Sequence, residues 1–125
     1  MIQVICPVCG AALEPQGTAW RCVQGHCFDV ARQGYVNLLT VTQKHSRHPG
    51  DTREMVAARR AFLDAGWYAP IAKTLADLVR RFCPAAASVL DAGCGEGYYL
   101  SQLGWIPERW GIDISRDAVR YAAAR

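Results

Sequence analysis

Four cysteines and one histidine near the N-terminus have the spacing of a metal site. Cys6 and Cys9 form a C-x2-C pair, and Cys22 is followed by His26 and Cys27, so that one spacing is C-x2-C-x12-C-x3-H. Zinc prefers four tetrahedral nitrogen and sulfur ligands, and two tight turns joined by a short hairpin can supply them. We therefore predict one structural zinc ion held by the first three cysteines and a fourth ligand, with no position open for catalysis.

Other interpretations of this cysteine pattern remain. Spacing favours His26 only modestly over the adjacent Cys27 as the fourth ligand. A redox-active C-x2-C pair needs a strand–helix context that Cys6 lacks. Turns without metal would lack a core, because residues 1–40 hold few large aliphatic side chains. Cys83 and Cys94 lie outside this region and are interpreted as small buried hydrophobic residues.

A second constellation is a glycine loop with an acid downstream. Residues 89–99 (VLDAGCGEGYY) place a D-x-G-x-G-x-G sequence between a predicted strand at 88–92 and a predicted helix from about 96 to 103. Glycines let the backbone approach a ligand closely and leave a helix N-terminus free to face it. Asp113 ends the next predicted strand, at 110–114, where it can accept hydrogen bonds from both ribose hydroxyls of a nucleoside cofactor. This context favours nucleoside binding over a turn that only packs a helix on a strand.

The elements that must position these groups differ along the chain. Residues 1–40 contain short strand-like pieces between turns, and residues 41–51 indicate a polar loop. Asp51 and Glu54 predict a capping box for a helix that ends near Gly66, and Pro70 suits the first turn of a second helix. In that second helix the apolar spacing predicts one buried stripe, made of Ile71, Leu75, Leu78, Val79 and Phe82. A strand, a helix, a strand and a last helix capped by Ser115 follow, and this alternation predicts a doubly wound α/β sheet.

We divide the chain into a zinc-binding module (1–40), a basic arm with a connecting helix (41–69) and the N-terminal part of an α/β domain (70–125). With about 30 residues per strand–helix unit, a sheet of six or seven strands needs about 180–200 residues. The sequence holds two such strands, which would leave Ile112 and Ile114 uncovered. We therefore expect the N-terminal part of a longer enzyme and no turnover from these 125 residues alone.

Composition and charge narrow the class of protein. Of the 125 residues, 51% are hydrophobic and 20% charged, as in a folded domain. No apolar run approaches the roughly 18 residues of a membrane span, and the first residues do not resemble a signal peptide, so we expect a cytoplasmic protein. The net charge is +3, and residues 41–60 account for it with five basic and two acidic side chains. This cluster is a candidate polyanion-binding patch, although charge alone favours a solvated helix face.

The motifs together resemble a known family. The D-x-G-x-G-x-G loop with its ribose acid resembles class I S-adenosylmethionine-dependent methyltransferases. Residues 25–39 (GHCFDVARQGYVNLL), Pro49-Gly50-Asp51 and residues 55–68 (MVAARRAFLDAGWY) resemble the large-subunit ribosomal RNA guanine-N1 methyltransferases, which include the tylosin- and mycinamicin-resistance enzymes. The resemblance runs in register over essentially the whole chain. It implies a zinc-ribbon-like module followed by the first part of a class I, Rossmann-like methyltransferase sheet.

The resemblance also implies sites and partners. The family's zinc ligands fall on Cys6, Cys9, Cys22 and His26, and its cofactor contacts fall on Tyr68, Gly93, Gly95, Glu96 and Gly97, with Asp113 added by the general class I pattern. The implied reaction transfers a methyl group from S-adenosylmethionine to N1 of a guanine in a 23S rRNA hairpin. In this family a full-length member can form a homodimer, so the resemblance also makes a second copy of the chain a candidate partner. No catalytic residue is expected within these residues, and a catalytically inactive zinc- and RNA-binding module is the alternative.

Overall fold

The N-terminal region of the computed structural model, which describes residues 2–125, is a small antiparallel sheet with long turns. Its strands are β1 (Glu14–Gln16), β2 (Ala19–Arg21) and β3 (Cys27–Asp29), paired in the order β1-β2-β3. A bridge between Ile5 and Ala12 closes a further turn at the start of the chain. After the sheet, a single 3-10 turn, η1 (Val41–Gln43), opens the loop that leads to the helices. This arrangement matches the short strands and turns expected for residues 1–40.

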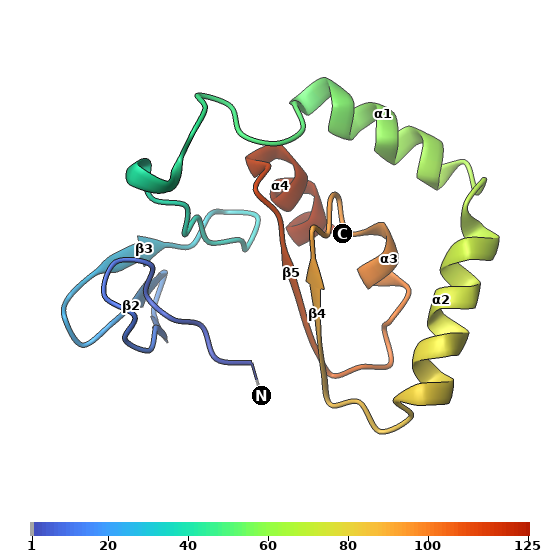
Figure 1. Ribbon diagram of the computed structural model, residues 1–125, viewed down its shortest axis with the longest axis horizontal. Coiled ribbons are helices and arrows are strands. Elements are labelled where there is room, and N and C mark those ends of the chain that lie inside the picture. The colour runs from blue at the N-terminus through green and yellow to red at the C-terminus, as the bar shows by residue number, and fades with distance from the viewer. Residues whose placement is uncertain (1) are drawn as a thin grey trace.

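The rest of the chain alternates helices and strands. It comprises α1 (Arg53–Asp64), α2 (Ala69–Phe82), β4 (Ser88–Ala92), α3 (Tyr98–Ser101), β5 (Glu108–Ile112) and α4 (Arg116–Ala124). Strands β4 and β5 pair in parallel, from Ser88 opposite Glu108 to Ala92 opposite Ile112. In Figure 1 the N-terminal sheet lies on one side of these two strands, while α1 and α2 form an arc around the other side. The described part of the chain is therefore an α/β structure with a separate N-terminal module. None of the helices in this part is long and apolar enough to cross a bilayer.

Local chemistry sets where the helices begin. Helix α1 starts one residue later than the predicted capping box requires, because Thr52 and not Asp51 is the N-cap. The Thr52 hydroxyl accepts the backbone N–H of Met55 at 3.3 Å. Ser115 caps α4 as predicted, accepting the N–H of Ala118 at 3.1 Å.

Two predicted elements have different bounds in the structure. Helix α3 begins only after Gly97, because Gly97 has φ +87° and therefore cannot continue a right-handed helix back to residue 96. The helix ends at Ser101, two residues before the predicted end. Strand β5 lies two residues earlier than predicted. The carbonyl of Ile112 accepts the N–H groups of Gly93 and Cys94, at 2.8 and 3.0 Å, so the glycine loop closes over the end of the strand there.

The buried face of α2 differs from the predicted stripe. Ala72 and Ala76 are buried, and they pack against Tyr98 of α3 and against Leu103 and Ile106 beyond it. Small residues let the helix approach closely. Val79 is the member of the predicted stripe that is partly buried, and it packs against the cluster of Ala76, Leu103 and Ile106. The exposed members of the predicted stripe are Ile71, Leu75, Leu78 and Phe82. Cys94 is buried as expected, but Cys83 is exposed, because it follows the last turn of this helix at the surface.

Aromatic and polar contacts join the N-terminal module to the sheet. The rings of Trp20 and Trp110 meet edge to face at 5.9 Å, and Glu108 accepts hydrogen bonds from the Trp110 indole and from the backbone N–H of Ile2. An apolar cleft of about 720 Å³ lies between the module and the sheet. Ile112 and Ile114 line it and are more than half exposed, as the sequence predicted.

Candidate metal centre and cofactor loop

The N-terminal module brings four potential metal ligands together. The ligand atoms of Cys6, Cys9, Cys22 and His26 all lie within 4.8 Å of one another. The two cysteine turns and the sheet position them, since Cys22 follows β2 directly and His26 precedes β3. Cys6 and Cys22 are themselves buried in the module's small core, together with Leu13. A metal ion there would tie together a module that has little other apolar interior.

The spacing of these atoms fits tetrahedral zinc. The sulfurs of Cys9 and Cys22 are 3.7 Å apart, and the Cys22 sulfur is 3.4 Å from Nδ1 of His26. Zinc–sulfur bonds of about 2.3 Å and zinc–nitrogen bonds of about 2.0–2.1 Å at a tetrahedral angle place such pairs about 3.8 and 3.5 Å apart. The donor set of three thiolates and one imidazole is typical of a closed structural zinc site.

The backbone of the second turn prepares Cys22 as a thiolate. Burial raises the pKa of the Cys22 thiol, but hydrogen bonds from the backbone and ring of His26 and from the backbone of Gln24 outweigh burial and bring the pKa to about 6. For Cys9, the backbone of Ala11 lowers the pKa, but burial and the neighbouring sulfurs of Cys22 and Cys6 together raise it. Closely spaced sulfurs oppose one another's ionisation. A bound divalent cation would offset this repulsion and stabilise the thiolate form.

Cys27 lies outside this cluster. It begins β3, where it pairs with Arg21, and its side chain is exposed. The strand geometry therefore separates two adjacent residues that the sequence could not separate by spacing. The structure places His26, and not Cys27, with the other three ligand atoms.

The glycine loop between β4 and α3 has an open, left-handed backbone. Gly93, Gly95 and Gly97 have φ values of +81°, +57° and +87°. A Cβ added to Gly93 or Gly95 would meet no atom within 4 Å, so space lies beside the loop at both positions. Gly97 instead packs on Ala122 of α4, where a Cβ would come within 3.1 Å of the backbone. The first two glycines are therefore where a ligand could approach the backbone, and the third fixes the packing of the loop.

Asp113 is tied to this loop through both carboxylate oxygens. Oδ2 accepts the backbone N–H of Gly95 at 3.0 Å, and Oδ1 accepts the N–H of Ser115 at 2.8 Å. The side chain therefore connects the end of β5 to the loop after β4. Each carboxylate oxygen has a second lone-pair direction, so Asp113 can still accept a hydroxyl donor.

Negative charge gathers around the loop. Burial and the charge of Asp113 raise the pKa of Asp91, the last-but-one residue of β4. The buried Cys94 thiol responds to the same field, because burial and the charges of Asp113, Asp91 and Glu96 raise its pKa to about 11. A site of this sign favours a cationic ligand. Asp91 was not among the sequence-predicted site residues, although the first acid of the D-x-G-x-G-x-G pattern marks its position.

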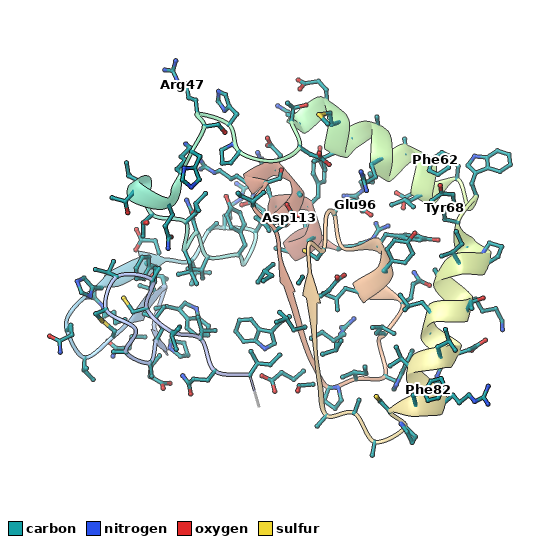
Figure 2. The ribbon with its side chains drawn as sticks, viewed as in Figure 1. Arg47, Phe62, Tyr68, Phe82, Glu96 and Asp113 are labelled. Carbon is teal, nitrogen blue, oxygen red and sulfur yellow. The ribbon has the colours of Figure 1, made fainter. Side chains whose placement is uncertain are left out.

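Glu96 carries an unsatisfied buried carboxylate. Its side chain is 1% exposed, and within residues 2–125 neither carboxylate oxygen has a hydrogen-bond partner. Its charge neighbour is Arg125, whose guanidinium lies 3.4 Å away and also bonds Asp64 at α1. A buried carboxylate left in this way is expected to have a donor group supplied by a ligand or by water. Figure 2 shows Glu96 at the glycine loop, on the side that faces α1.

Tyr68 lies at the elbow between α1 and α2. It is partly exposed, and its ring meets that of Phe62 edge to face at 4.9 Å (Figure 2). The elbow packs on the start of α3 through Leu63 and Ala72, which contact Tyr98. The structure therefore places Tyr68 on the element that covers the beginning of α3.

The basic arm is exposed along its length. Lys44, His45, Arg47 and His48 are exposed, and the Arg47 side chain points away from the molecule (Figure 2). The arm ends at Pro49–Asp51, where the chain meets the end of β5. Arg59 and Arg60, farther along α1, are instead engaged by Asp51 and Asp64. Exposed basic charge therefore continues from the loop onto α1, where Arg53 and Arg59 are also exposed.

Comparison with known proteins supports both parts of the chain. Residues 4–47 match the zinc ribbon family described as "RlmA, N-terminal". The chain is 46% identical over 123 residues to a 23S rRNA (guanine(748)-N(1))-methyltransferase from Streptomyces fradiae. It is 42% identical over 139 residues to a protein from Micromonospora griseorubida and 33% identical over 129 residues to one from Bacillus subtilis, both named as candidate 23S rRNA (guanine-N(1)-)-methyltransferases.

The coverage of these matches is unequal. Each alignment includes 94% of this chain but only 43%, 46% and 44% of the three relatives, in that order. The chain thus spans less than half the length of the curated relatives it matches. The resemblance to the ribosomal RNA guanine-N1 methyltransferases and the presence of a zinc ribbon are both confirmed.

Proposed function

We propose that this chain acts in the S-adenosylmethionine-dependent methylation of N1 of a guanine in a 23S rRNA hairpin. The observation that carries this proposal is the alignment over 94% of the chain with methyltransferases of that name. The zinc ribbon is matched independently over residues 4–47. The proposed division is a zinc module at 1–40, an arm and connecting helix at 41–69, and the N-terminal part of a class I methyltransferase domain at 70–125.

The proposed zinc ion is structural. Cys6, Cys9, Cys22 and His26 would fill all four positions of a tetrahedral ion, which leaves none for substrate. Its role would be to fix the two turns and the sheet that presents Trp20 to Trp110. In this way the ion would hold the N-terminal module against the methyltransferase part.

The proposed cofactor site is the loop between β4 and α3. Gly93 and Gly95 offer open backbone, and Asp113 can accept ribose hydroxyls. The buried carboxylate of Glu96 has no hydrogen-bond donor among the residues that the structure describes. S-adenosylmethionine carries a sulfonium and an ammonium group, which suit the negative field of this loop. We propose that Gly97 shapes the loop, and that Tyr68 closes the site from the elbow between α1 and α2.

The chemistry needs a nucleophile, a methyl donor and a path for one proton. N1 of guanine would form the new bond to carbon while the sulfur–methyl bond breaks, leaving S-adenosylhomocysteine and releasing the N1 proton. The bound cofactor supplies the activated methyl group. The residues of this chain would bind and orient it, and no catalytic residue is assigned among residues 2–125.

We propose that the basic arm contacts phosphates of the RNA hairpin. Lys44 and Arg47 are exposed, and phosphate contacts position RNA without reading its sequence. For a single-stranded or hairpin RNA, each phosphate contact contributes about 0.7–0.9 to the slope of log affinity against log salt. Lys44→Ala and Arg47→Ala should each lower that slope by about one unit or slightly less. An unchanged slope in both variants would contradict the assignment of the arm.

The outer face of α2 supports the proposed homodimer. An apolar patch runs from the end of α1 along α2, formed by Phe62, Trp67, Tyr68, Ile71, Leu75, Leu78 and Phe82. The four aromatic side chains of this patch are 41–71% exposed. At about 150–250 Å² for a fully exposed aromatic side chain, together they expose roughly 350–550 Å², which is within the size range of patches that mark interfaces. We assign this face to a second copy of the chain. Phe82→Asp should convert a dimer to a monomer in sedimentation, and a wild-type monomer at high concentration would contradict it.

Binding of S-adenosylmethionine tests the proposed function against its alternative. Calorimetry on the zinc-loaded chain should show binding that Asp113→Ala weakens, because the ribose hydroxyls lose their acceptor. No heat at high ligand concentration would instead favour a zinc-dependent RNA-binding module without catalysis. Methyl transfer to unmodified large-subunit RNA is the second test: we expect no turnover from this chain by itself, and a measurable rate would contradict that expectation. As a protein that acts on ribosomal RNA, it would work in the cytoplasm.

A further inference from the structure

The end of the basic arm is locked onto the turn that carries Asp113. Gly50 has φ +77°, and a Cβ added there would lie 2.9 Å from the backbone nitrogen of Ser115 and 2.9 Å from Ile114. The chain at residue 50 therefore lies in direct contact with the turn between β5 and α4. No side chain larger than hydrogen fits without displacing one of the two segments.

Ser115 joins three parts of the molecule. Its side chain is 1% exposed, and its hydroxyl donates to the carbonyl of Asp51 at 2.7 Å. The same oxygen accepts the N–H of Ala118 and so caps α4. Its backbone N–H donates to Oδ1 of Asp113 at 2.8 Å. One small buried residue thus connects the arm, the last helix and the acid at the end of β5.

The connection continues into the glycine loop. Oδ2 of Asp113 accepts the N–H of Gly95, so an unbroken chain of hydrogen bonds runs from Asp51 through Ser115 and Asp113 to the loop. The exposed residues of the arm, 44–48, lie immediately before this anchor. Any displacement of Pro49–Asp51 would move Ser115 and release one of the two bonds that fix the Asp113 carboxylate.

We propose that Gly50 and Ser115 are positioning residues, which set the orientation of Asp113 and couple it to the basic arm. The inference rests on the proposed function for the meaning of Asp113 as a cofactor acid. The contacts themselves do not depend on it. Neither residue would touch the cofactor, because both act through the carboxylate of Asp113.

The test is amide hydrogen exchange on the zinc-loaded chain, followed by NMR. The reporters are the N–H groups of Gly95 and Ser115, because both donate to Asp113. Gly50→Ala should accelerate their exchange by about tenfold, since the arm must lift away and a charged hydrogen bond is lost. Gly17→Ala is the matched control, because Gly17 is also left-handed, with φ +63°, but has open space around its Cβ.

Variants at Ser115 address the same contact from the other side. Ser115→Ala removes the bond to Asp51 together with the helix cap, whereas Gly50→Ala leaves the cap in place. Ser115→Thr retains the hydroxyl and should restore slow exchange. We expect Gly50 and Ser115 to act through the same contact. In the double variant Gly50→Ala/Ser115→Ala, the reporter amides should therefore exchange no faster than in the faster of the two single variants. Zinc content and the melting temperature show that each variant is folded.

A second measurement separates this inference from the proposed function. Calorimetry compares S-adenosylhomocysteine with an analogue that lacks both ribose hydroxyls. Gly50→Ala should weaken the first by about tenfold and leave the second unchanged, because only the first uses Asp113. If the wild-type chain binds neither probe but the amide exchange responds as expected, the proposed function fails and the positioning role stands.

Three outcomes would overturn the inference. Unchanged exchange of Gly95 and Ser115 in Gly50→Ala would show that the arm does not hold Asp113. Equal acceleration in Gly17→Ala would show a general loss of stability. Additive effects in the double variant would show that the two residues act through separate contacts.

Discussion

The identity of the fourth zinc ligand gives the sharpest prediction. His26 and Cys27 are adjacent, and both are chemically able to bind zinc. In the structure, Nδ1 of His26 lies 3.4 Å from the Cys22 sulfur, whereas Cys27 is exposed at the start of β3. His26→Ala should therefore weaken zinc binding strongly, and Cys27→Ala should leave it nearly unchanged.

The expected magnitude follows from the closed donor set. Structural zinc binds small domains with apparent free energies of about 10–16 kcal/mol at pH 7. Shared among four ligands, this is on the order of 2.5–4 kcal/mol each, or a loss of about 70- to 900-fold in affinity for His26→Ala. For an exposed side chain outside the site, such as Cys27, we expect a change within about 0.5 kcal/mol.

Competition with a chromogenic chelator measures both affinities, and elemental analysis gives the stoichiometry. The two alanine variants serve as controls for each other, since each removes one potential ligand from neighbouring positions. The far-UV circular dichroism of His26→Ala should also lose signal from the N-terminal sheet, whereas Cys27→Ala should retain it. Strong loss of zinc in Cys27→Ala with retention in His26→Ala would refute the assignment.

Three further predictions follow from the packing. Burial and a neighbouring acid raise the pKa of Asp91, so the folded chain loses stability as pH rises through that raised pKa. Asp91→Asn should therefore raise the melting temperature at pH 7, and the gap from wild type should close as pH falls. Ala72→Leu should lower the free energy of unfolding in urea by about 1–3 kcal/mol, because it overpacks the buried face of α2. Leu75→Ala, on the exposed face, should lower it by about 1 kcal/mol or less. The reverse order would contradict the observed buried face of α2. Because the Trp20 ring packs against the Trp110 ring, Trp20→Ala should increase the quenching of Trp110 fluorescence by iodide. Unchanged quenching would show that the N-terminal module does not pack against β5 through Trp20.

The sequence predicted the elements that depend on local chemistry. The strand at Ser88–Ala92 and the Ser115 cap follow from apolar runs and from side chains that satisfy nearby backbone groups. The cysteine spacing predicted a zinc module for the same reason, because ligands on two tight turns need few long-range contacts. These features need only a few neighbouring residues to specify them.

Other features depend on contacts between segments far apart in the chain. Apolar spacing showed that α2 has one hydrophobic stripe. Packing buried Ala72 and Ala76, with Val79 as the partly buried member of the predicted stripe, because close approach to α3 requires small side chains. The sequence could not show that Gly50 lies against Ser115, since 64 residues separate the hydroxyl of Ser115 from its acceptor on Asp51.

The sequence by itself determined the chemistry that the chain carries: a cysteine and histidine donor set, a glycine loop and an acid downstream. Each of these is a short motif whose residue types are its signature. The tertiary structure decided which of two adjacent residues faces the zinc ligands, because strand pairing turns Cys27 away from them. It also decided what holds Asp113, because both oxygens of its carboxylate are fixed by backbone groups that only folding brings together.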